Sequence, residues 1–323
     1  MSISVACCTY NGALFLEDQL ESLVGQTRPP DEIVIVDDAS RDDTARIVEQ
    51  FSRSAPAGIA VVFQRNVTNC GVTENFRKAI SLTTGELIFL CDQDDVWHSS
   101  KIETMCRVFE TRSDLTLLHS DARLIGGEGG TLSCSLFEAL EMTSRERRLI
   151  RRGSAFTALL ARNLVTGATT ALRRSVFDAA RPFPNEWVHD EWLAIIAAAV
   201  GNVDYVDSQL IDYRQHSANQ IGMRPLTLNQ KFAKLSRARE HRYQRVQRRV
   251  EVLLEKLVSL GSVVPKERVR KVHEKLEHVG VRAALPQNRA ARIVPIVREI
   301  ATGRYTQYST GIRSIAQDFC EPA

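Results

Sequence analysis

The feature that most constrains the fold is an alternation of short apolar segments with segments of helical spacing over roughly the first 90 residues. Four segments have the length and composition of buried strands: SVACC (4–8), EIVIV (32–36), IAVVF (59–63) and ELIFL (86–90). Three stretches between them have helical spacing: 16–24, 42–51 and 73–82. The second of these helices is expected to have Ser40 as its N-cap. Such alternation predicts an α/β fold with a mostly parallel, doubly wound sheet, and apolar strands of this kind fit burial on both faces.

Polar residues follow each of the four predicted strands. In chain order these are Cys8-Thr9-Tyr10-Asn11-Gly12, Asp37-Asp38, Arg65-Asn66 and Asp92-Gln93-Asp94-Asp95. Ligands of doubly wound sheets bind beyond the carboxyl ends of the strands. All four segments are therefore expected to meet at one crevice.

The carboxylates of Asp92, Asp94 and Asp95 directly follow the apolar run LIFL, where unpaired charges are costly. A basic side chain, a metal ion or a helix N-terminus would offset that cost. Oxygen ligands suit Mg²⁺ or Mn²⁺, and such a metal normally takes phosphate as a further ligand. The chain contains neither GxxxxGK[ST] nor GxGxxG. A metal, rather than a glycine loop, is therefore expected to hold the diphosphate of a nucleotide substrate.

Both acidic clusters also have a plainer interpretation. Asp37 and Asp38 could belong to a turn that caps the next helix. The cluster 92–95 could be a solvated cap between a strand and a helix.

The net charge of +3 divides unevenly along the chain. Residues 1–223 carry 21 Lys and Arg against 30 Asp and Glu, a charge of −9, whereas residues 224–323 carry 21 against 9, a charge of +12. Three helices are expected in this basic region: 231–260, 267–280 with Gly280 at its end, and 293–303 with Pro295 in its first turn. The region is interpreted as a helical subdomain packed on the rest, as an amphipathic surface for anionic lipid, or as a homodimer contact.

The cysteines and the apolar segments bear on the cellular compartment. The chain has seven cysteines and no CxxC pair, which indicates reduced thiols. MSISVACC lacks a basic leader and an apolar signal core. The longest apolar run, at 193–201, is too short to span a bilayer. A cytoplasmic protein is expected, in peripheral contact with the inner face of the plasma membrane if the basic helices bind lipid.

Besides the polar residues at the strand ends, the chain has several short motifs further along the sequence. Seven segments stand together: CTYNG (8–12), QTRPPDEIVIVDDAS (26–40), NCGVTENF (69–76), GELIFLCDQDDVW (85–97), TGAT (166–169), HDEWLA (189–194) and YRQH (213–216). As a set they resemble the family 2 glycosyltransferases with the GT-A fold, in particular their bacterial rhamnosyltransferase-like branch. The resemblance covers roughly residues 1–222. It implies a GT-A domain at 1–223 and an accessory basic helical region at 224–323.

For the donor, the resemblance implies a nucleoside-diphosphate sugar linked to dTDP or UDP. Asp38 would bond the pyrimidine edge, and Asp92 would hold the ribose or a metal-bound water. Asp94 and His216 would ligate the divalent metal. Thr9, Tyr10 and Asn11 would form the floor of the base and ribose pocket. The remaining residues expected on the donor side are Cys8, Arg65, Asn75, Gln93, Trp97 and Lys101.

For the reaction, the resemblance implies inversion at the anomeric carbon, with Asp190 as the catalytic base. The donor sugar would be rhamnose and the acceptor a saccharide or a lipid-linked saccharide of the cell surface. Many relatives read HDWW where this chain reads HDEW, so the choice between Asp190 and Glu191 stays open. The residues expected on the acceptor side are Thr166, Gly167, His189, Glu191 and Trp192.

Two other classes of function share features with these residues. A metal-dependent nucleotidyl- or phosphotransferase would also place acids at strand ends, but it normally has a lysine- or glycine-rich phosphate loop, and CTYNG is not one. A nucleic-acid binder would use the basic region with interleaved aromatic residues. The region has Tyr243, Tyr305 and Tyr308, but the acidic first part of the chain argues against a nucleic-acid partner.

Overall fold

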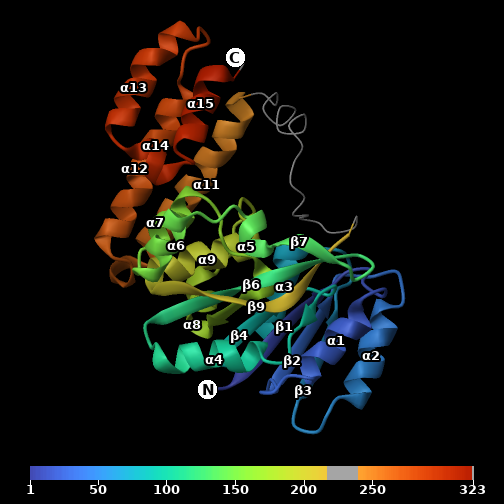
Figure 1. The fold of residues 1–323 in the computed structure, drawn as a ribbon. Helices are drawn as coiled ribbons and strands as arrows, with labels where there is room; N and C mark the ends of the chain where they lie inside the picture. Colours follow the sequence, from blue (N-terminus) through green and yellow to red (C-terminus); the bar gives the residue numbers. More distant parts are fainter. Residues whose placement is uncertain (217–238, 322–323) are drawn as a thin grey trace.

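The computed structural model describes residues 1–216 and 239–321, the side chains of 239–241 excepted. Its first part has the expected alternation of strands and helices (Figure 1). The strands are β1 (Ile3–Thr9), β2 (Glu32–Asp37), β3 (Ala60–Arg65) and β4 (Leu87–Cys91). The helices are α1 (Leu16–Val24), α2 (Thr44–Ser54) and α3 (Val72–Leu82). The four strands pair in parallel in the order β3-β2-β1-β4, so their carboxyl ends lie at one edge of the sheet.

The prediction of Ser40 as a helix N-cap was wrong. Helix α2 begins at Thr44 with Asp43 in the N-cap position. The Ser40 hydroxyl instead donates to Asp37 and accepts a bond from the backbone N–H of Asn11 at 2.8 Å. Ser40 therefore joins the ends of β1 and β2 beside the expected crevice.

The second part of the chain extends the same sheet. Its strands are β5 (Val96–Trp97), β6 (Leu115–Gly126), β7 (Thr131–Ser135), β8 (Thr170–Arg173) and β9 (Asn202–Gln215). The full order is β3-β2-β1-β4-β8-β6-β9-β5, with β7 on β6. Strand β8 runs antiparallel to both β4 and β6, whereas β6 and β9 are parallel. The sheet is thus mixed but mostly parallel, as expected.

Helices cover both faces of this curled sheet (Figure 1). Those of the second part are α4 (Lys101–Thr111), α5 (Leu136–Ala139), α6 (Ser144–Arg151), α7 (Ala155–Ala161), η1 (Gly167–Thr169), α8 (Arg174–Ala180) and α9 (His189–Val200). One core lies between the sheet and α1, α2 and α4, and the other lies between the sheet and α3, α8 and α9. Burial on both faces explains why β1, β2 and β4 are mostly apolar. The expectation was wrong for β3, which lies at the edge of the sheet and is exposed or half-buried along its length.

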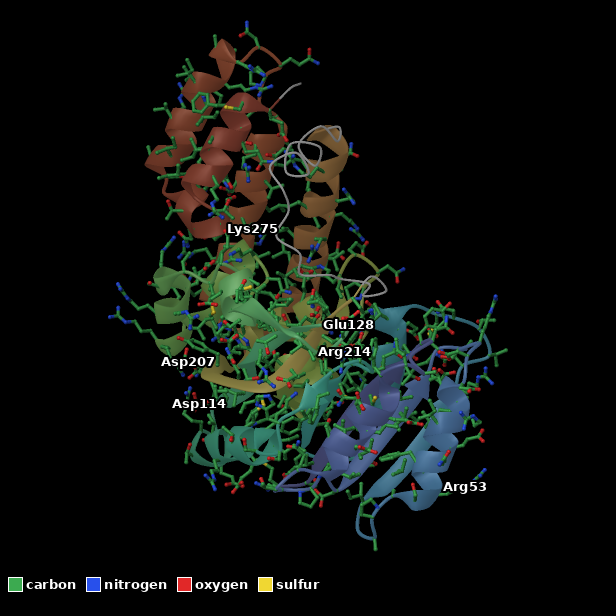
Figure 2. All side chains as sticks on the ribbon, turned by 45° about the vertical axis from the view of Figure 1, so that its right-hand side comes forward. Arg53, Asp114, Glu128, Asp207, Arg214 and Lys275 are labelled. Atoms are coloured by element: carbon green, nitrogen blue, oxygen red, sulfur yellow. The ribbon has the colours of Figure 1, made fainter. Side chains whose placement is uncertain are left out.

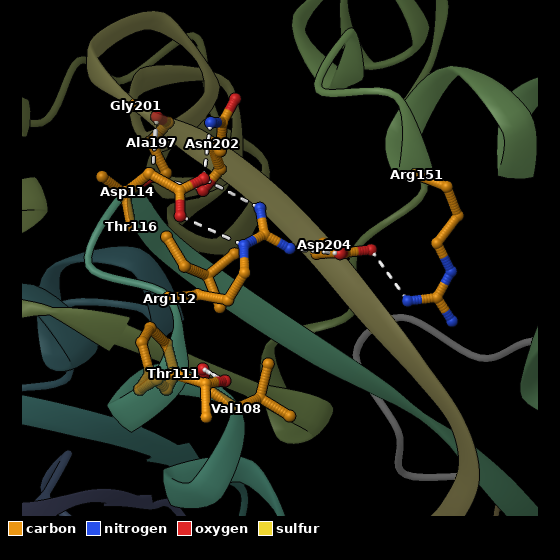
Figure 3. A network of polar contacts seen from close by, with 12 residues as sticks. Val108, Thr111, Arg112, Asp114, Thr116, Arg151, Ala197, Gly201, Asn202 and Asp204 are labelled. Atoms are coloured by element: carbon orange, nitrogen blue, oxygen red, sulfur yellow. Dashed lines mark hydrogen bonds and ion pairs between the residues drawn. The ribbon is translucent and has the colours of Figure 1, made fainter.

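A polar network fixes the start of β9 (Figure 3). The Arg112 guanidinium donates to Asp114 at 2.8 Å and to Asp204 at 2.9 Å, and Arg151 reaches Asp204 at 3.1 Å. Gly201 precedes the strand, and a Cβ there would lie 2.2 Å from the Thr116 side chain, so no larger residue fits. The network thus holds β9 near Asp204, and the other end of the strand, at Tyr213, lies at the crevice.

The C-terminal helices pack on α7 and α9. They are α11 (Arg239–Ser259), η2 (Gly261–Val263), α12 (Lys266–Ala283), η3 (Ala290–Arg292), α13 (Ile293–Ala301), α14 (Arg304–Tyr308) and α15 (Ile312–Cys320). Val250, Leu253 and Leu257 of α11 are buried in the same core as α9. Lys275 on α12 donates to the Leu160 carbonyl at the end of α7 (Figure 2).

These helices differ in detail from the expected ones. Residues 231–238 of the first expected helix lie outside the described residues. Helix α12 does not end at Gly280 but runs to Ala283, because His278, Val279 and Arg282 around the glycine are buried and their packing outweighs its low helix propensity. Helix α13 has Pro295 in its first turn, as expected, and ends at Ala301. Among the described residues, no helix is long and apolar enough to cross a membrane.

Candidate active site

The carboxyl ends of β1, β2 and β4 and the start of α9 surround a cavity of about 490 Å³. This volume lies in the range of small-molecule sites. Thirteen of the predicted site residues line it: Cys8, Thr9, Tyr10, Asp38, Asn75, Asp92, Gln93, Asp94, Thr166, Gly167, His189, Asp190 and Glu191. The structure therefore brings together the strand ends and the TGAT and HDEW segments, although these lie far apart in the chain, from Cys8 to Glu191.

Among the residues that the structure describes, six of the predicted site residues do not line the cavity. Trp97 and Lys101 are buried together, with the ammonium 3.6 Å from the indole ring centre. Arg65 is half exposed and its Nε lies 3.3 Å from an Asp37 oxygen. The Asn11 side chain accepts a bond from the backbone N–H of Arg41.

The other two of these six come from α9 and from the end of β9. Trp192 is buried in the core, and its indole N–H donates to the Ala180 carbonyl at 2.8 Å. His216 lies directly behind the lining, with its Nε2 2.9 Å from an Asp94 carboxylate oxygen. His216 is thus one contact away from the cavity, whereas Trp192 is part of the protein core.

Lys101 is the basic side chain that the acids of the crevice require. Its ammonium donates to the Ala168 carbonyl at 2.7 Å and attracts both Asp92 and Asp95. Burial lowers the pKa of Lys101 to about 7, and the neighbouring acids act in the opposite direction. Arg214 and His216 lie beside Asp94, so these two side chains and Lys101 are the basic partners that the structure shows for the three acids.

Asp92 is the acid of this cluster whose carboxyl group has the fewest partners. Burial, then Asp94 and Asp190, raise its pKa to about 7, and Lys101 offsets only part of this. Its carboxylate accepts no hydrogen bond from the residues that the structure describes, although it lines the cavity. Asp95 is fully buried, accepts from the backbone N–H of Arg214, and has its pKa raised well above the usual value by burial. The raised pKa values show that the charged forms of Asp92 and Asp95 are disfavoured by burial and by the neighbouring acids.

The donor set fits Mg²⁺ or Mn²⁺ bound together with a diphosphate. Asp94 and His216 offer a carboxylate and an imidazole within 2.9 Å of one another. In the described part of the chain, no three acidic, histidine or cysteine side chains are grouped as a complete metal cage. Mg²⁺ is usually held by one or two carboxylates together with substrate phosphates and water. Two protein ligands beside an open cavity would leave the other coordination positions of the metal to a diphosphate and water.

Asp38 forms another wall of the cavity. It accepts bonds from the backbone N–H groups of Cys70 and Gly71 at 2.8 and 2.9 Å and from the Asn66 amide at 2.8 Å. Burial by itself raises the pKa of Asp38, but these donors outweigh it and leave the pKa below the usual value. Asn75, which donates to the Val36 carbonyl, supports this corner by accepting from Asn66 at 2.9 Å. Asp38 is thus a fixed, ionised acceptor.

Gln93 has a structural contact that its place in DQDD did not suggest. Its amide accepts from the Tyr10 N–H at 2.7 Å and donates to the Tyr10 carbonyl at 3.0 Å, so it pairs with the backbone at the end of β1. A Cβ on Gly12 would lie 2.1 Å from the Gln93 side chain. The glycine of CTYNG is therefore required for this pairing, which holds the β1 loop at the cavity.

Asp190 lies in the first turn of α9, where backbone N–H groups favour negative charge. One carboxylate oxygen accepts from the Gly167 N–H at 3.1 Å, and the other accepts from the Glu191 N–H at 2.7 Å. Burial raises the pKa of Asp190, and these backbone donors partly offset the rise. A carboxylate with a raised pKa that faces a cavity has the properties of a general base.

The two neighbours of Asp190 have different partners. The His189 ring stacks on Phe76 with the ring centres 4.0 Å apart, and burial lowers its pKa to about 3. His189 is therefore neutral and acts as a wall of the cavity. Glu191 forms an ion pair with Arg249 of α11, and both side chains line the cavity.

Sequence reasoning missed eight lining residues: Val72, Phe76, Leu140, Asn163, Val165, Val188, Tyr213 and Arg249. Tyr213 is the first residue of YRQH, so the motif itself was a usable signal. Arg249 belongs to RVQRRV, where nothing in the helical pattern separates it from Arg248. Only the packing of α11 on α9 identifies it.

The chain belongs to glycosyl transferase family 2, whose family model matches residues 4–179. An uncharacterised glycosyltransferase of Nostoc sp. is 29% identical over 68% of this chain and 66% of its own length. The dTDP-rhamnosyl transferase RfbG of Shigella flexneri is 25% identical over 73% of this chain and 80% of its own length. Uncharacterised Mycobacterium proteins are 27% identical, and this chain spans 59% of their length. The predicted family is confirmed.

Solved structures show the fold. TarS of Staphylococcus aureus in complex with UDP-GlcNAc matches with a TM-score of 0.57 and 17% identity, over 93% of this chain and 81% of that one. The mannosyltransferase PcManGT of Pyrobaculum calidifontis, in complex with GDP-Man and Mn²⁺, matches with a TM-score of 0.54 and 16% identity, over 98% and 85%. The predicted GT-A fold is confirmed.

Proposed function

We propose that the protein is a metal-dependent, inverting glycosyltransferase that moves a sugar from a nucleoside-diphosphate donor to an acceptor hydroxyl. One observation carries the proposal. The Asp190 carboxylate, with its raised pKa, lines the same cavity as Asp38, Asp92 and Asp94. A base and a site for a metal-bound diphosphate therefore face one space of nucleotide-sugar size.

The donor is proposed to bind along the strand ends. Asp38 has one oxygen that accepts only the Gly71 N–H, which leaves room for an N–H of a pyrimidine base. Asp94 and His216 would ligate the metal, and a bound Mg²⁺ or Mn²⁺ would neutralise the charge that develops on the leaving diphosphate. Asp92, whose carboxylate is without a hydrogen bond among the described residues, would contact the ribose or a metal-bound water.

Transfer is proposed to be a single displacement. The oxygen of an acceptor hydroxyl attacks the anomeric carbon while Asp190 accepts the hydroxyl proton. The bond from that carbon to the diphosphate oxygen breaks, and its electron pair leaves with the nucleoside diphosphate. Because the diphosphate is a good leaving group, no second carboxylic acid is needed to protonate it, unlike in glycoside hydrolysis. Attack from the opposite face inverts the configuration.

Rhamnose from dTDP-rhamnose is the proposed donor, and a saccharide or lipid-linked saccharide of the cell surface is the proposed acceptor. The support is the similarity over most of both chains to the Shigella dTDP-rhamnosyl transferase. Membership of family 2 favours this proposal over a nucleotidyl- or phosphotransferase. The cavity is lined by five acidic residues, which would repel the phosphates of a nucleic acid, so it does not support a nucleic-acid partner.

A donor screen tests the proposed function. The protein is incubated with dTDP-, UDP- and GDP-sugars, with Mn²⁺ or with chelator, and with saccharide and lipid-linked acceptors. Nucleoside diphosphate release that requires both metal and acceptor is expected with dTDP-rhamnose. Release of pyrophosphate, or of no nucleotide product from any donor, would contradict the proposal. Melting temperatures with nucleoside diphosphates and with oligonucleotides separate a nucleotide site from a nucleic-acid surface.

A further inference from the structure

The acceptor side of the cavity contains a residue from the C-terminal helices. Arg249 of α11 lines the cavity together with Asp190 and Glu191. It is the one positively charged side chain among the described residues of the lining. The basic region therefore contributes directly to the site that the GT-A domain forms.

Packing fixes the position of Arg249. Its guanidinium lies 4.1 Å from the ring centre of Trp187, and the Trp187 indole N–H donates to its backbone carbonyl at 3.1 Å. One terminal nitrogen is paired with Glu191. A guanidinium carries five N–H donors, and no described residue accepts from its Nε or its other terminal nitrogen. The fixed side chain thus keeps donors available at the cavity.

Arg249 brings a positive charge to the side of the cavity that Asp190 and Glu191 line. Lys275 of α12 lies near enough to Arg249 and Glu191 for its charge to interact with both. Arg249 and Lys275 thus lie near Glu191, whereas no lysine or arginine is among the described lining residues of the donor side. Planar guanidinium groups bind phosphate and carboxylate in a bidentate manner.

We propose that Arg249 binds an anionic group, phosphate or carboxylate, carried by the acceptor, and so selects charged saccharide acceptors over neutral ones. This inference rests on the proposed glycosyltransferase function. Arg249 shares its guanidinium between Glu191 and the anion, and the acceptor hydroxyl is thereby directed towards Asp190. The nucleotide, the diphosphate and the metal stay on the opposite side, at the strand ends.

The test compares acceptors that differ only in charge. A saccharide 1-phosphate, the corresponding methyl glycoside and a uronic acid analogue are used with Arg249→Gln, Arg249→Lys and wild-type protein. Loss of a charged hydrogen-bonded pair is expected to lower kcat/KM for the phosphate acceptor by on the order of 10- to 100-fold, mainly through KM. The methyl glycoside should lose little, and Arg249→Lys should retain part of the preference. The uronic acid arm shows whether a carboxylate serves as well as a phosphate.

Arg248→Gln is the matched control. Arg248 is the adjacent arginine of α11, but it pairs with Glu186 and Glu255 away from the cavity lining. Equal losses for charged and neutral acceptors in Arg249→Gln, or an equal effect of Arg248→Gln, would overturn the inference. Donor-dependent release of nucleoside diphosphate by the wild type is measured in parallel. Its absence would refute the proposed function, whereas its presence with an unchanged acceptor preference would refute only the role of Arg249.

A second inference follows from an exposed face of α13. Figure 1 places α13 at the end of the molecule opposite α2. Ile293, Val294, Val297 and Ile300 are 42–55% exposed and follow one another at helical spacing, whereas Ile296 faces inward. Four neighbouring exposed aliphatic residues on one helix are uncommon on a monomeric surface.

The charges around this face indicate what covers it. Over residues 286–303, the exposed charges are those of Arg289 and Arg298, and the acid of this span, Glu299, is buried. A second copy would bring like charges together, whereas an anionic lipid surface would attract them. We infer that the apolar face of α13 docks on anionic membrane.

Co-sedimentation with vesicles tests the α13 surface. Wild-type protein is expected to bind phosphatidylcholine vesicles that contain phosphatidylglycerol, and to bind pure phosphatidylcholine vesicles far less. Val294→Asp with Val297→Asp should weaken binding by on the order of tenfold or more, since both apolar burial and charge attraction are reduced. Val67→Asp is the control, because Val67 is 98% exposed in a loop outside the C-terminal helices. An unchanged double variant, or a lipid-free dimer that the double variant dissociates, would overturn the inference.

Discussion

Asp190 and Glu191 are neighbours in the chain but have different partners. Backbone N–H groups hold Asp190 towards Gly167, and Glu191 is paired with Arg249. The Arg249 guanidinium occupies the Glu191 carboxylate, whereas the hydrogen bonds that Asp190 accepts come from backbone N–H groups. This contrast supports Asp190 as the residue that takes the proton.

Asp190→Asn tests this assignment, because the amide keeps the shape of the side chain but cannot accept a proton. Transfer is expected to fall by on the order of 10²–10⁴, the usual contribution of general-base catalysis. Donor affinity measured by calorimetry should be retained. Glu191→Gln is the matched control and should retain most of the transfer rate with neutral acceptors. Opposite behaviour of the two variants would make Glu191 the base.

Asp94→Ala is expected to abolish the dependence of donor binding on Mn²⁺. The substitution removes one of the two proposed metal ligands from a side chain at the cavity, so the fold should remain intact. Calorimetry with dTDP-rhamnose, with and without Mn²⁺, measures the effect, and circular dichroism checks the fold. Unchanged metal-dependent affinity would exclude Asp94 as a ligand.

Asp38→Ala is expected to weaken nucleotide binding but to leave the metal requirement unaltered. The change removes an acceptor for the base and also leaves the N–H groups of Cys70 and Gly71 without their partner. Affinities for dTDP, UDP and GDP should converge, since the proposed base contact is lost. Wild-type affinities for all three would show that the base binds elsewhere.

At the scale of elements, prediction from sequence succeeded where local pattern and burial agree. β1 to β4 each combine an apolar run with a polar end, and the structure has all four. The region from β5 to β9 has no such regular alternation. There β8 pairs with β4 and β5 pairs with β9, each antiparallel and between strands distant in sequence, so no local pattern predicts these pairs. Most of the predicted site residues line the cavity, because many of them lie at the ends of these strands. Arg249 depends on tertiary packing that no local pattern encodes.

His119 on β6 provides a pH test at this scale. Both of its ring nitrogens are buried without a hydrogen bond among the described residues, and burial lowers its pKa from 6.5 to about 3. Above pH 6.5 the folded and unfolded states are both neutral at this residue. Below it, the unfolded chain binds a proton that the folded state excludes, so stability falls as the pH drops from about 6.5 towards 3.

Urea denaturation at pH 7 and pH 5 measures this effect in the wild type and in His119→Leu. The histidine is expected to account for about 2 kcal/mol of the stability that the wild type loses between the two pH values. The leucine variant should therefore lose less. Identical losses in both proteins would show that His119 becomes protonated without unfolding.

At the scale of the whole molecule, the GT-A domain and the basic helices share one core. Val250, Leu253, Leu257 and Val272 are buried against α7 and α9, and each buried side chain of this size contributes roughly 1.5–3 kcal/mol. A chain truncated after residue 216 is therefore expected to bind a hydrophobic dye and to melt at a lower temperature than the full chain. Equal melting temperatures would show that the two regions are independent.

The placement of Arg249 on α11 also has a consequence for biosynthesis. A ribosome releases the strand ends long before it releases α11, so the newly made chain holds Asp38, Asp92 and Asp94 while Arg249 is still missing from the cavity. The apolar surface of α7 and α9 is exposed during the same interval, which is when chaperones bind nascent proteins. If Arg249 selects the acceptor as proposed, a chain interrupted before α11 would hold the proposed donor side of the cavity without the residue that selects the acceptor.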